Sequence, residues 1–243
     1  QWPRLHRLLV ARVASMPASE RIPLRERIAE ICRDQLQDPA GCATQLEAIA
    51  AAHPERVPVW QQLQDLYMRV LDRPEEWLRV AQAELSSVPT PRRELALRVA
   101  IGRLLLDSAR RPTRTGPHDA IGHYERAFQL DPSHAEAAEV LVRHYEHERS
   151  PEDVARVLEG HLGCLDAVRV AERDELRLRL ARVWARELAD DTRARALLET
   201  VRTARGAVPE VAEPLAEILE RAGSGGGPDD AELASLCHDV VAR

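Results

Sequence analysis

The sequence contains no lysine and no asparagine, so every basic residue other than histidine is an arginine. Without lysine, a glycine-rich phosphate loop closed by Lys cannot exist. The acidic residues outnumber the arginines, and the formal net charge is −6. A general affinity for nucleic-acid phosphates needs a clustered positive excess, so this balance argues against nucleic-acid partners and equally against a membrane surface.

Aromatic residues are also scarce, at 3% of the chain, whereas 44% of the residues are hydrophobic and 30% are charged. This balance, with few strand-forming residues, predicts an all-α protein. No apolar run approaches the roughly 20 residues that span a bilayer, and no signal-peptide pattern opens the chain, so no membrane insertion is expected. Because the chain starts at Gln1, we expect it to be a segment of a longer protein whose targeting sequence could lie upstream.

The four cysteines are widely spaced, at positions of the apolar periodicity: Cys32, Cys42, Cys164 and Cys237. A free thiol at such a position behaves as a small hydrophobic side chain. We therefore predict four buried thiols, a reducing compartment and a cytoplasmic location.

The chain repeats internally. Residues 24–49 align with residues 176–201 without a gap, and a further copy begins at Leu97. In each copy a large apolar residue directly precedes a small one, which lets neighbouring helices approach closely: Ile28 and Ala29, Ile101 and Gly102, Leu180 and Ala181. Apolar residues recur three and four positions apart, which is typical of amphipathic helices.

The second helix of each copy repeats the order small, large, acidic, small to medium. The matching residues are Cys42, Leu46, Glu47 and Ile49; Ala120, Tyr124, Glu125 and Ala127; and Ala194, Leu198, Glu199 and Val201. A related hairpin follows each copy, with Trp60, Leu63 and Tyr67; Ala138, Leu141 and Tyr145; and Ala212, Leu215 and Leu219. There Gln64 and Val142 replace the small residue and are predicted to widen their contacts.

The segment with Ala120, Tyr124, Ala127 and Pro132 resembles the tetratricopeptide repeat, as does the first-helix pattern Trp60, Leu63, Tyr67. The resemblance implies a right-handed α-solenoid of stacked antiparallel helical hairpins, a tetratricopeptide-like superhelix that occupies residues 1–243 as one domain. The expected elements are a lone helix at 1–16 and hairpins at about 21–52, 56–87, 91–131 with an insertion at 108–118, 134–165, 170–206 and 209–242.

In this family the first helix of each hairpin lines a concave groove, so the resemblance implies which side chains face a partner. They lie two or six positions beyond the core Leu or Ile. The proposed partner-binding residues are Asp65, Arg69, Arg103, Arg143, His147, Arg182, Arg186 and Arg221, and the same rule adds Glu30, Asp34, Asp107 and Glu217. Helix-spaced ion pairs such as Glu139 with Arg143 are an alternative explanation for these charges.

The family's lysine and asparagine clamp for the carboxyl terminus of chaperone tails needs both residue types that are missing here, so a co-chaperone function is excluded. His144, His147, His161 and Cys164 have spacings that could bind zinc. We favour a packing role, because His144 takes the position of Leu66 and Ile218 in related hairpins. No nucleophile motif is present, so we predict no enzymatic activity and no cofactor.

Three functions remain open. The leading hypothesis is a scaffold or adaptor segment of a larger bacterial-type protein that binds a partner protein or peptide. A second is a regulatory arm of an attached catalytic domain. The third is an α-helical nucleic-acid binder, suggested by Arg110, Arg111 and Arg114 in the insertion, but that segment lacks interleaved aromatic residues, and a solvated loop is favoured.

Overall fold

The structure of this chain is a computed structural model that describes residues 1–17, 20–87, 89–109, 117–206 and 208–222. These residues form α-helices and two short π-helical turns, with no strand among them, which confirms the all-α prediction. The chain divides into two compact units, residues 1–120 and residues 121–243. Arg110, Arg111, Arg114, Cys237 and the second helix predicted for the last hairpin lie outside the described residues.

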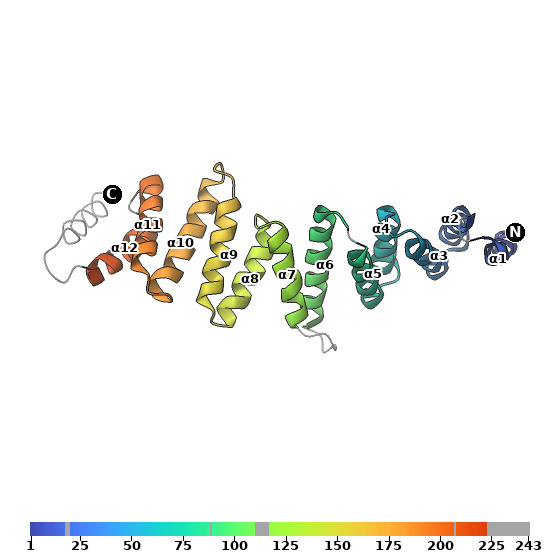
Figure 1. Cartoon of the computed structure of the whole chain (residues 1–243), viewed down its shortest axis with the longest axis horizontal. Helices are drawn as coiled ribbons and strands as arrows, with labels where there is room; N and C mark the ends of the chain where they lie inside the picture. Colours follow the sequence, from blue (N-terminus) through green and yellow to red (C-terminus); the bar gives the residue numbers. More distant parts are fainter. Residues whose placement is uncertain (18–19, 88, 110–116, 207, 223–243) are drawn as a thin grey trace. The chain divides into compact units, whose positions relative to one another are not determined.

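Unit 1 is a series of helices in which each one packs on the next (Figure 1). Two of its helices, α2 and α4, each continue into a short π-helical turn, and these turns are labelled η2 and η3. The elements are α1 (Trp2–Ser15), α2 (Arg21–Ile31), η2 (Cys32–Leu36), α3 (Pro39–Ala52), α4 (Val57–Asp65), η3 (Leu66–Val70), α5 (Pro74–Ser86) and α6 (Pro91–Ala109). Proline at N1 or N2 starts several of these helices, where the missing N–H costs no hydrogen bond.

Unit 2 is also a series of antiparallel helices, and the boundary between the two units falls within α7. From α8 onward each helix packs on the one that follows, and α10 also contacts α12. The elements are α7 (Pro117–Leu130), α8 (Ala135–His147), α9 (Pro151–Cys164), α10 (Val170–Arg186), α11 (Asp191–Arg205) and α12 (Pro209–Ala222).

The core of each unit is built from the repeated residues. The large residue of the large–small pair, such as Ile28 or Ile101, is fully buried, and its small neighbour is buried beside it. On the second helices Ala120, Ala127 and Ala194 are fully buried as well. The residues that repeat in the sequence are therefore the ones that pack between neighbouring helices.

The glutamate that recurs on the second helices accepts a hydrogen bond from the tyrosine that recurs on the following first helix. The Tyr145 hydroxyl on α8 donates a hydrogen bond to Glu125 on α7, and Arg156 on α9 donates to the Tyr145 oxygen over 3.4 Å. In unit 1 Glu47 accepts from Tyr67 in the same way. Burial and the adjacent carboxylate raise the pKa of each tyrosine to about 12. Each link joins the second helix of one hairpin to the first helix of the next.

Gln64, which replaces the expected small residue, is buried within a polar cluster. Its amide nitrogen donates to Glu84 Oε2 over 2.7 Å, and its amide oxygen accepts from Arg93 over 2.9 Å. Arg93 also donates two hydrogen bonds, of 2.7 and 2.8 Å, to the two oxygens of Glu84, whose side chain is 1% exposed. The three side chains satisfy one another and link α4, α5 and α6.

Four hairpin turns share one backbone device. A residue one to three positions after the end of the first helix adopts the left-handed conformation, and the amide of the following residue donates to a carbonyl five or six residues earlier, near the end of that helix. The left-handed residues are Gln37, Asp72, Arg149 and Ala189, with φ between 48 and 56°. None is glycine, so each turn carries the steric cost of a side chain in this region.

Cys32 and Cys42 are buried free thiols, as predicted, and burial raises the pKa of both. Cys164 is exposed, which corrects the prediction that it is buried. It lies in the last turn of α9, where the buried positions are His161 and Leu165, four residues apart, and Cys164 falls off that side of the helix.

Candidate protein-binding surfaces

In unit 1 the exposed sides of the first helices α2 and α4 border a cleft of about 330 Å³. Behind both helices lies α3, whose buried Leu46 and Ile49 close the bottom of the cleft. Its rim is charged, with Glu26, Glu30, Arg33 and Arg56. Glu30 belongs to the groove set predicted from the sequence.

The rim charges of this cleft are paired. Arg56 contacts Glu26 across the cleft at 2.7 Å, and Arg27 contacts Glu30 at 2.8 Å. Arg33 donates to Asp34, and this hydrogen bond lowers the pKa of the aspartate. Because each of these side chains is at least partly exposed, the ion pairs orient the charged groups at the rim but contribute little to the stability of the fold.

The other predicted residues of unit 1 lie on exposed helix surface. Asp65 and Arg69 form an i,i+4 ion pair of 3.3 Å. Arg103 on α6 and Asp107 are exposed too. Counting two or six positions beyond the core Leu or Ile therefore identifies charged residues that are exposed on the first helices.

In unit 2 a charge network joins the first helices α8 and α10. Arg179 donates to Glu139 over 2.8 Å and to Glu146 over 2.9 Å, and Arg143 donates to Glu139 over 2.8 Å. Burial opposes ionisation of Glu139, but the two arginines outweigh it and lower the pKa of the carboxyl. The Glu139–Arg143 pair expected from the sequence is confirmed, and Arg179 and Glu146 extend it to the neighbouring helix.

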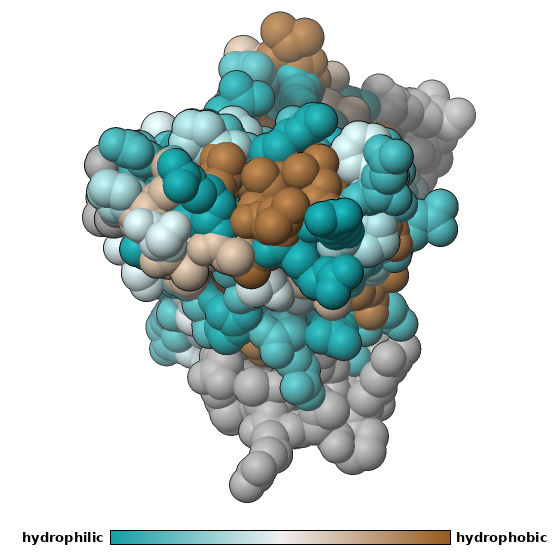
Figure 2. Space-filling view, turned by 90° about the vertical axis from the view of Figure 1, so that its right-hand side faces the viewer, coloured by the Kyte–Doolittle hydropathy of each residue, from teal (hydrophilic) through white to brown (hydrophobic). Residues whose placement is uncertain are grey.

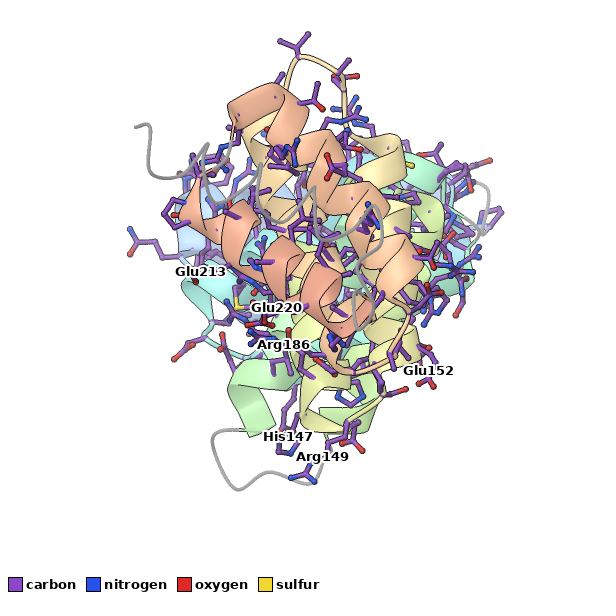
Figure 3. All side chains as sticks on the ribbon, turned by 90° about the vertical axis from the view of Figure 1, so that its left-hand side faces the viewer. His147, Arg149, Glu152, Arg186, Glu213 and Glu220 are labelled. Carbon is purple, nitrogen blue, oxygen red and sulfur yellow. The ribbon has the colours of Figure 1, made fainter. Side chains whose placement is uncertain are left out.

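Further along the same surface, Arg182 and Arg186 of α10 line a cleft of about 380 Å³ with α12. Glu210, Glu213 and Glu217 line its other side. Arg186 lies 3.5 Å from Glu217, and Figure 3 shows Arg186 near the centre of the view, with Glu213 and Glu220 along α12. Arg182 makes no ion pair with any residue of the described ranges.

Arg221 and His147 lie apart from this cleft. Arg221 contacts Asp191 at 3.1 Å and donates to the Ala185 carbonyl over 3.3 Å, so it holds α12 against α10 and α11. His147 is exposed in the last turn of α8 and lies beside Arg149 in Figure 3. Within unit 2, the structure thus brings together Arg182, Arg186 and Glu217.

The histidines and the cysteine considered for zinc have other surroundings. His161 is buried, and its Nδ1 donates to the Pro132 carbonyl over 2.7 Å. His144 is half-buried against the ring of Tyr145, which fits the packing role. Across the described ranges no group of three acidic, histidine or cysteine side chains is placed to hold a metal ion. Nor does any helix within them have both the length and the apolar character of a membrane span.

No protein-family model and no curated protein sequence matches this chain. Similar solved structures include the C-terminal part of a TPR repeat-containing protein from Cytophaga hutchinsonii, at 12% identity and a TM-score of 0.43, over 87% of this chain and 79% of that chain. A tetratricopeptide repeat protein from Parabacteroides merdae has 14% identity and a TM-score of 0.38, over 97% and 91%. MamA has 14% identity and a TM-score of 0.40, over 72% and 92%.

Proposed function

We propose that this chain is a non-catalytic scaffold or adaptor segment that binds a partner protein or peptide through the exposed surface of its first helices. The observation that carries the proposal is the unit 1 cleft, which is bordered by the first helices α2 and α4 and has a charged rim. An extended peptide could place an apolar side chain against Pro58, which is exposed at the cleft, and exchange hydrogen bonds with the rim arginines.

In unit 2 the proposed contacts are Arg182 and Arg186, with Arg143 and His147 further along the same surface. Arg182 has no ion-pair partner among the described residues, and Arg186 lies 3.5 Å from Glu217. Asp65, Arg69, Arg103 and Arg221 are proposed as peripheral contacts. Free thiols at Cys32, Cys42 and Cys164 support a reducing compartment such as the cytoplasm.

Two neighbouring glutamines on α4 give a matched test. Gln62 lines the cleft and Gln61 does not, and both are exposed in the same helix. Gln62→Arg places a long charged side chain at the cleft mouth, whereas Gln61→Arg adds the same charge outside it. Affinity capture with the full chain as bait, quantified by mass spectrometry, should lose a specific partner with Gln62→Arg and keep it with Gln61→Arg.

A second pair tests unit 2. Arg182→Gln removes a charge from the α10–α12 cleft, and Arg205→Gln removes one from the exposed surface of α11. If all four variants recover the same proteins as the wild-type chain, the first-helix surface is not the binding surface. Recovery of no specific protein at any salt concentration would count against the scaffold function itself.

A further inference from the structure

The second helices α9 and α11 border a hollow of about 390 Å³, and α10 supplies its remaining wall. All three helices contribute apolar side chains to it: Leu162 of α9, Leu180 and Trp184 of α10, and Leu197 of α11. Leu162, Trp184 and Leu197 are only partly buried, so part of each side chain is accessible from the hollow. The hollow is therefore an open and mainly apolar surface.

The hollow lies beside the helix series of unit 2 and not at one of its ends. Each of α9, α10 and α11 packs on the helix before it and on the helix after it (Figure 1). Further repeats of the same chain stack beyond this series, so none of them occupies the hollow. The apolar patch of α1 in Figure 2 differs in this respect, because a helix stacked on α1 would cover it.

The hollow is also on the other side of α10 from the first-helix surface. Arg182 and Arg186 line the cleft between α10 and α12. Each of them follows a residue of the hollow, Leu180 or Trp184, by two positions. Two positions correspond to a rotation of about 200° around an α-helix, so the two sets of side chains have roughly opposite directions. A ligand in the hollow therefore leaves the α10–α12 cleft free.

Three lining residues distinguish this copy of the repeat from its counterpart in unit 1. In the gapless alignment of residues 24–49 with residues 176–201, the pairs, with the unit 2 residue first, are Trp184 and Cys32, Arg193 and Gly41, and Leu197 and Gln45. Gln45 accepts a hydrogen bond from Arg25, the counterpart of Arg177. In unit 2 a leucine takes the place of this amide, and a tryptophan and an arginine are added. These differences give the hollow both its apolar surface and a positive charge.

The charged lining favours an anionic ligand. Of the described residues that line the hollow, three are arginines and one is a glutamate. The Arg193 Cζ lies 4.4 Å from the centroid of the Trp184 ring, and the Arg193 Nε lies 3.3 Å from Asp190. The Arg193 side chain is 60% exposed, so its terminal N–H groups are available to a carboxylate beside the indole.

Arg173 offers a second group to an anion, further along α10. It donates to the Leu165 carbonyl over 2.9 Å and forms no ion pair within the described part of the chain. Its neighbour Arg177 is instead neutralised by Asp174 at 2.8 Å. From Arg173 to Trp184 the helix rises by about 16 Å, a distance that about five extended residues span. An extended peptide is therefore long enough to reach both ends of the hollow.

Two longer segments of the chain lie outside the described residues. Residues 110–116 contain three arginines and no carboxylate, so they do not complement the arginines of the hollow. Residues 223–243 contain acidic and apolar residues, but the repeat pattern predicts that they complete the last hairpin against α12. The hollow is therefore left for a segment of another protein.

We propose that this hollow binds an extended acidic segment of another protein, in which a large apolar side chain has one carboxylate beside it and another about four residues away. The apolar side chain packs on Trp184 and Leu197, and the carboxylates accept hydrogen bonds from Arg193 and Arg173. This second surface is separate from the first-helix clefts, so the inference stands apart from the function proposed above.

The probe is a fluorescently labelled peptide of about ten residues, too short for a stable helix, with phenylalanine and two glutamates at this spacing among glycine and serine. One comparison peptide has serine in place of phenylalanine, and another has lysine in place of glutamate. By fluorescence anisotropy the full chain should bind the probe roughly ten-fold more tightly than either comparison peptide, and added salt should weaken this binding.

Leu197→Gln introduces the residue type that unit 1 has at Gln45, so the fold should tolerate it, and melting followed by circular dichroism checks this. This variant should bind the probe roughly five-fold or more weakly, because it removes apolar contact area. Arg193→Gln should weaken binding a few-fold and reduce its salt dependence. Arg205→Gln on α11 and Arg182→Gln on the opposite side of α10 are the matched controls, and both should keep the affinity within about two-fold.

Two results would overturn the proposal: equal binding of the probe and the lysine peptide, and a folded Leu197→Gln or Arg193→Gln variant that binds as the wild type does. Two others would overturn it by giving the hollow a different occupant. A peptide of residues 228–243 that binds more tightly than the probe and depends on Leu197 would make it a site for this chain's own segment. A dimer in sedimentation that Leu197→Gln dissociates would make it an interface between copies.

Discussion

The Tyr67 hydroxyl donates a hydrogen bond of 2.8 Å to Glu47 Oε1, twenty residues earlier in the chain. Arg79 pairs with the same carboxylate, so the glutamate holds groups from two later helices. Tyr67→Phe should lower the free energy of unfolding by about 1–2 kcal/mol, because it removes a hydrogen bond to a charged acceptor. Urea unfolding of Tyr67→Phe, Glu47→Gln and the double variant measures the coupling. If the two effects simply add, the hydrogen bond does not contribute.

The raised tyrosine pKa values predict a loss of stability in alkaline solution. The pKa of Tyr67 and of Tyr145 is about 12 in the folded chain, above the ordinary tyrosine value of about 10. Folding thus favours the protonated phenols, and this contribution is complete below about pH 10 and is lost as the pH rises through about 12. Tyr67→Phe with Tyr145→Phe should flatten the fall in thermal stability over this range. An unchanged fall would show that other groups cause it.

The cluster of Gln64, Glu84 and Arg93 predicts a large effect from a partly exposed arginine. Arg93→Ala leaves the nearly fully buried Glu84 carboxylate without its charged partner and should cost about 3–5 kcal/mol in urea unfolding. Arg92→Ala is the neighbouring control, since Arg92 is exposed. Equal, small losses for both variants would contradict the role assigned to Arg93.

The left-handed turn residues predict a gain from glycine. Ala189 has a φ of 55°, so Ala189→Gly should raise the unfolding free energy by about 1 kcal/mol. The same substitution at the exposed helical Ala196 should instead lower it by about 1 kcal/mol. Chemical denaturation compares the two, and a loss at both positions would contradict the strain assigned to Ala189.

Two helical glycines predict opposite outcomes for one substitution. A Cβ at Gly122 meets no atom within 4 Å, so Gly122→Ala should stabilise the chain by roughly 1 kcal/mol through helix propensity. A Cβ at Gly160 would lie 3.1 Å from the Phe128 ring, so Gly160→Ala should gain less or lose stability. Melting temperatures decide, and an equal gain at both sites would show that Phe128 moves aside freely.

The large and small residues of the repeat could be predicted from the sequence because their periodicity directly reflects packing, as Ile28 and Ala29 show. The turns could not be predicted in this detail, since Gln37 and Ala189 give no sign of a left-handed backbone that glycine or asparagine would give. The polar contacts of Gln64 come from α5 and α6, so local sequence does not reveal them. Counting from the core residues correctly placed Arg182 on an exposed surface. The same counting missed Arg179 and Glu26, because their ion-pair partners lie on neighbouring helices.

The link between Glu125 and Tyr145 bears on how the hairpins fold together. It couples the formation of one hairpin to that of the next, as the bond between Glu47 and Tyr67 does in unit 1. Hairpins joined by such a bond should therefore fold and unfold more cooperatively. At the corresponding place on α12 the chain has Leu219, which has no hydroxyl to donate. We therefore expect amide hydrogen exchange to show α12 opening at lower free energy than α8.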